Sequence, residues 1–325
     1  MSTRFALACL ALTAVVLAAT AGDQWSSHPV PVTAGPGLTT AAWQAAFAPA
    51  PAPAAPGCNP RASLRPQGPL PAPGQMPAGS TMARIAKQDH LTVGVLEDTY
   101  PIAFRDVSSR RLEGFDIDVA RDIAGAIFGD RERVVFRPLR EADRFETVKS
   151  GQVDFTVAAA TITCQLREQL DFSTVYYEAG QRVLVNRGSA ITGLGDLGGK
   201  PVCAAAGTTS LWNVLAAPSK PIPVVPDVMT DCLMLLQLGQ VDAVSTDDTI
   251  LAGMATQDLQ TEVVGPRFTE EPYGVVMNKN TPDLVWFVNA VLERRAQDGR
   301  WRTSYEHWLA ALGPPPAPPT PQYQD

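Results

Sequence analysis

The sequence predicts an α/β fold divided into two lobes, and three observations point to it. The chain has 325 residues, which suits two domains with additional terminal segments. Strand-like and helix-like segments alternate from residue 91 onward, a pattern that favours mainly parallel sheets covered by helices. The alternation begins again after Tyr177, so we expect one such unit on each side of that residue.

The first unit contains a well-marked amphipathic helix between two strands. Phe115, Val119, Ile123 and Ile127 follow helical spacing, and Asp116 lies in the first turn, where a carboxylate favours the helix N-terminus. We also predict strands at residues 91–95, 134–136 and 153–158, and a short helix at 144–150 that ends at Gly151.

The second unit repeats the alternation. We predict strands at 201–205, 241–245, 263–264 and 274–277, and helices at 211–216, 231–238, 249–255 and 284–297. In open α/β sheets, ligands bind beyond the carboxyl ends of the strands, so binding residues are sought there.

The two ends of the chain differ in composition from the body at about 84–312. Residues 1–21 combine Arg4, an apolar run and a small-residue cleavage site at Ala19-Thr20-Ala21, which predicts a secretory signal, with an uncleaved anchor as the alternative. Residues 22–83 and 313–325 are rich in proline, so we expect an extended spacer and a similar tail.

Composition argues against several functional classes. The net charge of −7 disfavours a nucleic-acid partner, because an acidic chain repels the phosphate backbone. The three histidines are scattered, and no metal-binding or nucleophile motif is present in the sequence. We therefore expect a protein that is not an enzyme and needs no cofactor or metal.

Four cysteines remain once Cys9 is removed with the signal. Cys58, Cys164, Cys203 and Cys232 form an even set in an exported chain, which predicts two disulfides in one of three possible pairings. Four buried free thiols are the alternative.

Candidate ligand contacts follow the ends of predicted strands. Thr161 could offer a hydroxyl, and Thr208 and Thr209 open a helix whose N–H groups suit an anion. Asp247 could bind an ammonium group, and the Arg144 fork suits a carboxylate. The alternatives are turn chemistry for Thr161, helix capping for Thr208 and Thr209, and a solvated surface position for Arg144. Asp248 or Thr249 is expected to cap the helix that follows.

Several short segments between Leu91 and about Leu312 follow one another in a characteristic order and spacing. They are Gly114–Asp118, Gly151–Phe155, Thr161–Thr163, Asp171–Ser173, Tyr176-Tyr177, Gly199-Lys200, Gly207–Ser210, Val241–Val244 and Tyr273-Gly274. Together they resemble family 3 of the bacterial extracellular solute-binding proteins, which serve amino-acid ABC importers. The segment Ser245–Gly253, the body cysteines and the proline-rich spacer and tail are similar to those of actinobacterial glutamate/glutamine-type binding lipoproteins.

The resemblance implies a two-lobed type II periplasmic-binding-protein fold with an interlobe cleft. Lobe 1 would comprise 84–178 plus 272–312 and lobe 2 would comprise 179–271, with hinge strands near 178–180 and 272–274. An exported, monomeric protein is implied that passes a small polar solute, an amino acid of the glutamate, aspartate or glutamine class, to the membrane permease of an ABC importer. A sensor that signals to a membrane partner, or an enzyme on this fold, is the alternative.

The same resemblance assigns the candidate residues to roles. Thr161 matches a lobe 1 polar contact, Thr208 and Thr209 match carboxylate contacts, and Asp247 matches the ammonium-binding acid. Arg144 matches an arginine used by binders of acidic amino acids. Tyr100 lies near the usual aromatic wall.

Some positions depart from the family pattern. Leu166 replaces the arginine that grips the ligand α-carboxylate, with Arg167 one residue later. We therefore expect Arg144 or Arg167 to supply the positive charge, and Arg144 and Asp247 to face each other across the cleft. The cysteine that would accept a lipid is also absent, so we expect export without lipidation.

The lobe assignment leads to a specific disulfide pairing. Cys203 belongs to a lobe 2 strand and Cys232 to the next helix, so the two can approach. Cys58 then pairs with Cys164, which would attach the spacer to lobe 1.

Overall fold

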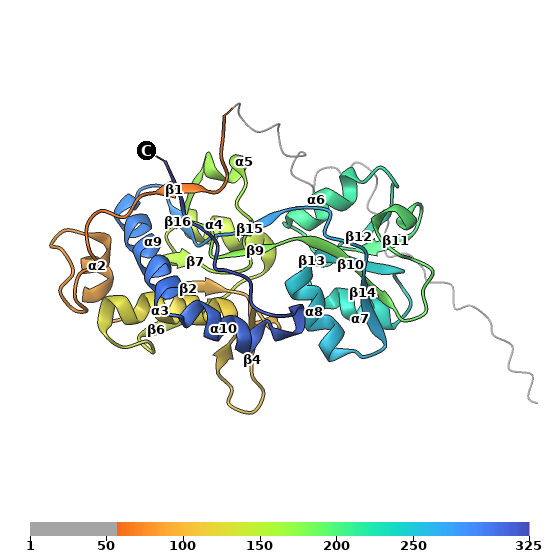
Figure 1. Cartoon of the computed structure of the whole chain (residues 1–325), viewed down its shortest axis with the longest axis horizontal. Helices are drawn as coiled ribbons and strands as arrows, with labels where there is room; N and C mark the ends of the chain where they lie inside the picture. Colours follow the sequence, from red (N-terminus) through yellow and green to blue (C-terminus); the bar gives the residue numbers. More distant parts are fainter. Residues whose placement is uncertain (1–56, 325) are drawn as a thin grey trace, which may run out of the picture. The chain divides into compact units, whose positions relative to one another are not determined.

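A computed structural model describes residues 57–324 of the chain. The predicted signal at 1–21 and the spacer as far as residue 56 lie outside these residues. Within them, two five-stranded sheets each form the centre of a lobe (Figure 1). We call residues 57–176 and 274–324 lobe 1, residues 180–270 lobe 2, and the two strands between them the hinge strands.

The lobe 1 sheet has the order β6-β2-β7-β16-β8. Its parallel half pairs β2 with both β6 and β7, and β16 then runs antiparallel to β7 and β8. These strands are β2 (Leu91–Val95), β6 (Val134–Pro138), β7 (Phe155–Thr156), β8 (Leu170–Phe172) and β16 (Val276–Asn278). The long return along the chain to β16 brings residues beyond 270 back into lobe 1.

The lobe 2 sheet has the order β12-β11-β13-β10-β14. Its parallel half pairs β11 with both β12 and β13, and β10 runs antiparallel to β13 and β14. These strands are β10 (Gln181–Asn186), β11 (Pro201–Cys203), β12 (Ile222–Val224), β13 (Ala243–Asp247) and β14 (Thr261–Val264). The two sheets therefore share one arrangement, with a parallel half and an antiparallel half.

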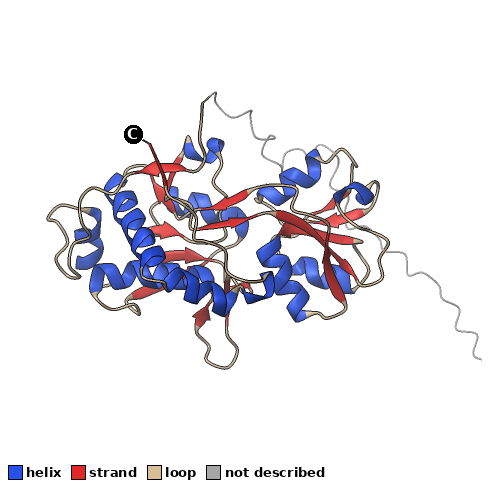
Figure 2. Cartoon of the chain, in the orientation of Figure 1, coloured by secondary structure: helices blue, strands red, loops and turns tan. Residues whose placement is uncertain are grey.

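Helices pack on the sheets (Figure 2). The predicted amphipathic helix is α3, and its apolar face is buried together with Asp116 and Asp122. The helices are α2 (Thr81–Lys87), α3 (Phe115–Phe128), α4 (Arg144–Lys149), α5 (Cys164–Arg167), α6 (Thr209–Ala216), α7 (Asp231–Gln237), α8 (Asp248–Gln257), α9 (Pro282–Gln297) and α10 (Arg300–Trp308). Short 3₁₀ turns are η1 (Glu141–Asp143), η2 (Leu194–Leu197) and η3 (Ala310–Leu312).

Two short antiparallel strands connect the lobes. They are β9 (Tyr177–Ala179) and β15 (Glu271–Tyr273), which pair with each other in a separate two-stranded sheet. A further small sheet, β3 (Asp98–Thr99), β4 (Ala103–Arg105) and β5 (Leu112–Glu113), lies before α3. The β9–β15 pair places Glu271 opposite Ala179.

Some predicted elements differ in extent from those observed. The strand expected at 153–158 is limited to β7, because residues 157–160 turn away and Ala159 adopts a positive φ of 46°. The sequence patterns did not predict α2, α5, α10, β3–β5, β8, β10 or β12. Most of these are short, and α10 is mainly polar, with Trp301, Ser304 and Tyr305 buried. β9 corresponds to the hinge strand that the family resemblance placed near 178–180.

Both predicted disulfides are confirmed: Cys58 bonds to Cys164 and Cys203 to Cys232, with Cα–Cα distances of 6.1 and 5.5 Å. The described part of the expected extended spacer and the expected tail both contain a short strand. β1 (Ala62–Leu64) pairs in parallel with β17 (Gln322–Gln324), so the dark-blue C-terminal segment returns to the beginning of lobe 1 (Figure 1).

The physical reason is that these segments obtain contacts from the body that they lack by themselves. The Ser63 hydroxyl donates to the Phe172 carbonyl oxygen at 2.6 Å, and the Asn289 side chain donates to the Leu64 carbonyl oxygen at 2.7 Å. The carbonyl oxygens of Leu64 and Pro60 thereby obtain hydrogen bonds from side chains of lobe 1, Asn289 and Arg167.

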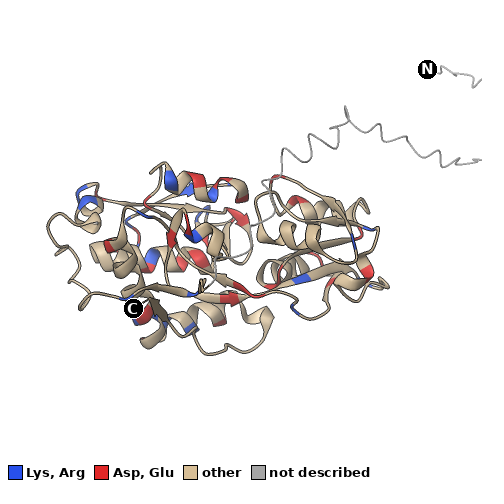
Figure 3. Ribbon diagram, turned by 90° about the horizontal axis from the view of Figure 1, so that it is seen from above, with Lys and Arg blue, Asp and Glu red and all other residues tan. Residues whose placement is uncertain are grey.

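Charge is unevenly divided between the lobes. Lobe 2, residues 180–270, contains five Lys or Arg and nine Asp or Glu, so it accounts for more than half of the net charge of −7. Figure 3 shows charged residues of both signs in lobe 1 and few basic segments in lobe 2. Among residues 57–324, none of the helices combines the length and apolar character needed to cross a membrane.

Candidate functional site

A small cavity lies between the lobes, at the carboxyl ends of several strands. Its volume is about 120 Å³, which suits a small ligand. The lining combines charged, hydroxyl and apolar groups from both lobes. It comprises Leu96, Glu141, Arg144, Phe145, Ala159, Thr161, Thr163, Gln165, Leu166, Gly207, Thr208, Thr209, Ser210, Trp212, Met229, Thr246, Asp247 and Ile250.

Direct contacts between the lobes surround this cavity. The Glu141 carboxylate accepts a hydrogen bond from the Met229 N–H at 3.1 Å, and Thr230 donates to Asp98 at 2.6 Å. A Cβ added to Gly253 of lobe 2 would lie 1.9 Å from the Tyr100 carbonyl oxygen, which shows how closely the two backbones approach. The two lobes therefore touch beside the cavity, which lies between them.

Arg144 begins α4 and reaches the cavity as a buried side chain. Its Nε donates to the Glu141 carbonyl oxygen at 2.8 Å, and its Nη1 donates to the carbonyl oxygens of Ala158 and Ala159 at 2.8 and 3.2 Å. Its Nη2 donates to the lobe 2 carbonyl oxygen of Gly207 at 3.2 Å. Since a guanidinium has five N–H donors, these four bonds leave one for a ligand.

Burial and neighbouring charges have opposite effects on the pKa of this arginine. Desolvation lowers the pKa of the Arg144 guanidinium, and the nearby carboxylates of Glu141 and Asp247 oppose that change. The solvated surface position considered as an alternative does not apply. Arg144 and Asp247 both line the cavity, one from each lobe.

Asp247 ends β13 and lies at the beginning of α8. Its side chain accepts a hydrogen bond from the Tyr273 hydroxyl at 2.5 Å through Oδ2, whereas Oδ1 is buried without a hydrogen-bond partner among the described residues. Burial, followed by repulsion from Glu271, raises the pKa of the Asp247 carboxyl well above its usual range. A cationic ligand group at Oδ1 would supply the missing partner.

The helix cap expected from Asp248 or Thr249 is wrong. The Asp248 carboxylate accepts from Arg267 Nε at 2.6 Å, and the Thr249 hydroxyl lies 3.1 Å from the Tyr273 hydroxyl oxygen. Both side chains therefore contact residues of other elements instead of the N–H groups at the start of α8.

The three candidate threonines reach the cavity in different ways. Thr208 caps α6, because its hydroxyl oxygen accepts from the Leu211 N–H at 3.1 Å and donates to the Ala205 carbonyl oxygen at 2.8 Å. The hydroxyls of Thr161 and Thr209 instead donate to Glu271 Oε2 at 2.6 and 2.9 Å. Capping was the alternative considered for Thr208, and it describes the contacts of that hydroxyl.

Two candidate residues are not among those that line the cavity. Arg167 donates from Nε to the Pro60 carbonyl oxygen at 3.0 Å and stacks over Phe172, and burial lowers the pKa of its guanidinium to about 10. The Tyr100 ring packs edge-on against Phe104 with ring centroids 4.9 Å apart. Arg144 is therefore the arginine that the structure places at the cavity, and Leu166 lines it where the family has an arginine.

Sequence reasoning missed two acidic side chains at this site. Glu141 lines the cavity, and burial raises the pKa of its carboxyl. Glu271 begins β15 and contacts two of the candidate threonines. The one signal available for Glu271 was its position directly before the expected hinge strand. No cluster suited to a metal ion occurs within residues 57–324.

The known proteins that this chain is similar to are solute-binding proteins. Residues 91–311 match the family described as "Bacterial extracellular solute-binding proteins, family 3". The "ABC transporter glutamine-binding protein GlnH" of Bacillus subtilis is 36% identical over 230 residues, 70% of this chain and 84% of the relative. The "Glutamine-binding protein" of Geobacillus stearothermophilus is 33% identical, over 62% of this chain and 78% of its own. The crystal structure of a cysteine-binding protein from Campylobacter jejuni superposes with a TM-score of 0.68 at 26% identity, over 71% of this chain and 94% of that one.

Proposed function

Because the chain belongs to family 3 of the bacterial extracellular solute-binding proteins, we propose that it binds an amino acid of the glutamate, aspartate or glutamine class outside the cytoplasmic membrane and delivers it to an ABC importer. Its fold is the type II periplasmic-binding-protein fold expected from the sequence. We further propose that it acts as an exported monomer without enzymatic activity.

The observation that carries this proposal is the pairing of Arg144 and Asp247 in one cavity. An amino acid has an ammonium and a carboxylate group on the same carbon, so it requires one anionic and one cationic partner. Asp247 Oδ1 lacks a partner among the described residues, and Arg144 retains one N–H. The first N–H groups of α6, at Thr209 and Ser210, have no acceptor within the helix and adjoin the same cavity.

These groups define roles for the ligand. The α-ammonium would bind Asp247, with a charge-assisted hydrogen bond. The α-carboxylate would bind Arg144 and the start of α6. This arrangement replaces the arginine that the family has at the position of Leu166, and Arg167 has no role in it because it donates to Pro60.

A thermal-shift screen of the purified protein against the common amino acids tests the proposal. A ligand present at about 100 times its Kd should stabilise the protein by about 2.7 kcal/mol, because it binds only the folded state. We expect glutamine, glutamate or aspartate to raise the unfolding temperature, and Asp247→Asn to abolish that shift. If no amino acid raises it, the proposal is wrong.

A further inference from the structure

Glu271 lies behind the cavity wall and connects both lobes from a hinge strand. Its side chain is 2% exposed. Oε2 accepts from the hydroxyl of Thr161 in lobe 1 at 2.6 Å and from the hydroxyl of Thr209 in lobe 2 at 2.9 Å. Oε1 accepts from the Asn213 amide nitrogen at 3.2 Å. The carboxylate is thus satisfied by three donors.

This bonding determines what the two threonines can offer a ligand. A threonine hydroxyl has one proton to donate and two lone pairs to accept. The Thr209 hydroxyl also lies 3.5 Å from the Thr161 hydroxyl oxygen, but its bond to Glu271 Oε2 is much shorter at 2.9 Å. With the protons of both hydroxyls directed to Glu271, Thr161 and Thr209 present lone pairs to the cavity that both residues line. These two hydroxyls therefore suit an N–H donor and not a carboxylate oxygen, whereas the backbone N–H groups at the start of α6 stay available for the α-carboxylate.

The charges of the cavity also favour a ligand without a second carboxylate. Among the described residues that line it, Arg144 is the one cation, whereas Glu141 and Asp247 are acidic and Glu271 lies directly behind. Arg144 has a single N–H left, which the α-carboxylate of an amino acid would use. A second carboxylate on the ligand would be buried without a cation, and such burial is costly.

We propose that Glu271 determines ligand specificity by positioning the Thr161 and Thr209 hydroxyls as acceptors, so that the site selects glutamine over glutamate. This inference rests on the proposed amino-acid-binding function. The glutamine side chain carries N–H donors and no charge, so its amide nitrogen can donate to the lone pairs of the Thr161 and Thr209 hydroxyl oxygens. The glutamate side-chain carboxylate has no proton to donate, and its negative charge is repelled by these lone pairs.

Titration calorimetry of the full exported chain with glutamine and with glutamate tests it. In the wild type, glutamine should bind at least about tenfold more tightly, which corresponds to about 1.4 kcal/mol. Glu271→Ala frees both hydroxyl protons and removes the negative charge, so the glutamate-to-glutamine ratio of Kd values should fall by about tenfold or more. Glu271→Gln removes the charge and keeps an acceptor, and it should lower the ratio by a smaller factor.

A neighbouring glutamate provides the matched control. Glu270 is adjacent in sequence, its side chain is 80% exposed, and it pairs with Arg61, so Glu270→Gln should leave the ratio within about twofold. If both ligands bind but neither Glu271 variant changes the ratio, or if the wild type prefers glutamate, the inference is wrong and the proposed function stands. If the wild type binds neither ligand, the proposed function fails and the inference fails with it. If Glu271→Ala does not fold, the ratio of Kd values measured for the isosteric Glu271→Gln tests the inference by itself.

Discussion

Single side chains at this site are defined by which of their polar atoms already have partners. Arg144 uses four of its five N–H donors within the protein, and Asp247 Oδ1 has no partner among the described residues. We therefore expect a ligand group to be recognised by the donors and acceptors that the fold leaves available. Two predictions follow from particular carboxylates.

The first concerns Asp247. Asp247→Ala should weaken binding of an amine-bearing ligand by about 2–5 kcal/mol, because the ligand ammonium would be buried without its charge partner. Titration calorimetry measures this loss. Asp242→Ala, an exposed aspartate just before the same strand, is the control and should bind normally. Unchanged affinity in the Asp247 variant would remove this residue from the site.

The second concerns Asp116, a buried carboxyl that accepts hydrogen bonds from the Ala159 N–H and the Tyr176 hydroxyl, both at 2.8 Å. Burial raises its pKa from 3.8 to about 7. Between these two values the unfolded chain releases the proton while the folded chain retains it, so this group lowers the free energy of unfolding as pH rises through the window. Asp116→Asn lacks this titration.

Denaturant unfolding of Asp116→Asn and the wild type at about pH 4.5 and pH 7.5 gives the measurement. The variant should gain about 3 kcal/mol relative to the wild type between the two pH values. Asp242→Asn carries the same substitution at an exposed position and should show no comparable gain. If the difference in free energy of unfolding between Asp116→Asn and the wild type were the same at both pH values, the raised pKa of Asp116 would be contradicted.

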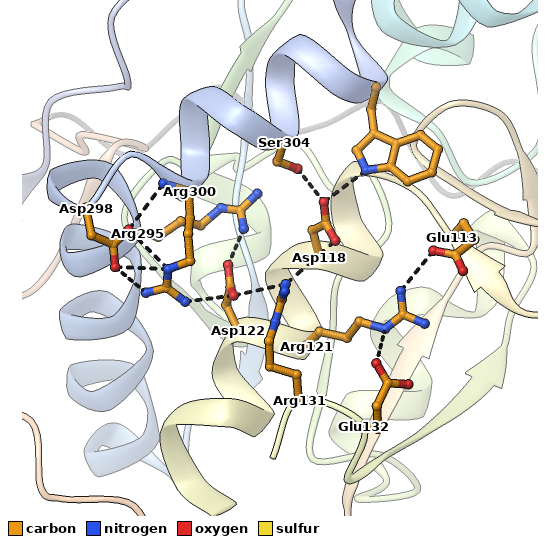
Figure 4. A network of polar contacts seen from close by, with 11 residues as sticks. Glu113, Asp118, Arg121, Asp122, Arg131, Glu132, Arg295, Asp298, Arg300 and Ser304 are labelled. Carbon is orange, nitrogen blue, oxygen red and sulfur yellow. Dashed lines mark hydrogen bonds and ion pairs between the residues drawn. The ribbon is translucent and has the colours of Figure 1, made fainter. Parts of the chain in front are cut away.

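At the scale of elements, helices of lobe 1 are joined by a buried ion network (Figure 4). Asp122 of α3 accepts from Arg295 of α9, from Arg300 of α10 at 2.7 Å, and lies 3.1 Å from Arg131. The side chains of Asp122 and Arg295 are 0% and 2% exposed. Asp118 on the same helix accepts from Ser304 at 2.7 Å, so α3 is fixed to α10 at two points.

Removing the centre of this network should be costly. Asp122→Ala leaves the Arg295 charge buried without its partner, and we expect a loss of about 3–5 kcal/mol in the free energy of unfolding. Asp298→Ala removes a 41% exposed partner of Arg300 and should cost less than about 1 kcal/mol. Urea denaturation compares the two variants. Equal losses would show that the buried position of Asp122 confers no special stability.

At the scale of the whole described chain, the two terminal segments meet on lobe 1. Beyond the β1–β17 pairing, the Arg65 guanidinium lies 4.6 Å from the Tyr323 ring centroid, and the Tyr323 hydroxyl donates to Glu293. Pro314, Pro316 and Pro319 line a groove that also includes Trp301 and Tyr305. The tail is therefore part of the packed structure.

Deleting residues 313–325 tests this role. We expect a loss of about 1–3 kcal/mol in the free energy of unfolding, since one cation–π contact and several hydrogen bonds disappear. None of the deleted residues lines the cavity, so the Kd for the amino-acid ligand should change by less than about twofold. Deletion of Asp325 alone is the control. Full stability after the large deletion would show that the tail contacts contribute nothing.

The sequence by itself determined the features that depend on local pattern. Apolar spacing located α3 and β2, and the order of short motifs identified the family and the two-lobed fold. Arg144 and Asp247 were also identified, because each follows from its position relative to a predicted strand or helix. The disulfide pairs followed once the lobes were assigned.

Only the tertiary structure decided which side chains meet. Glu271 lies 110 residues from Thr161 and 62 from Thr209 along the chain, yet it takes the hydroxyl proton of both. Arg167, adjacent to the expected arginine position, is held by the Pro60 carbonyl oxygen 107 residues away. No local pattern encodes such bonds. Hinge strand β15 brings Glu271 to the two threonines, and the Cys58–Cys164 disulfide joins the segment that contains Pro60 to the helix that contains Arg167. Arg144, Asp247 and the threonines that line the cavity could be predicted from the sequence. The positions of Glu141 and Glu271, the exclusion of Arg167 and Tyr100, and the acceptor of each hydroxyl depended on the fold.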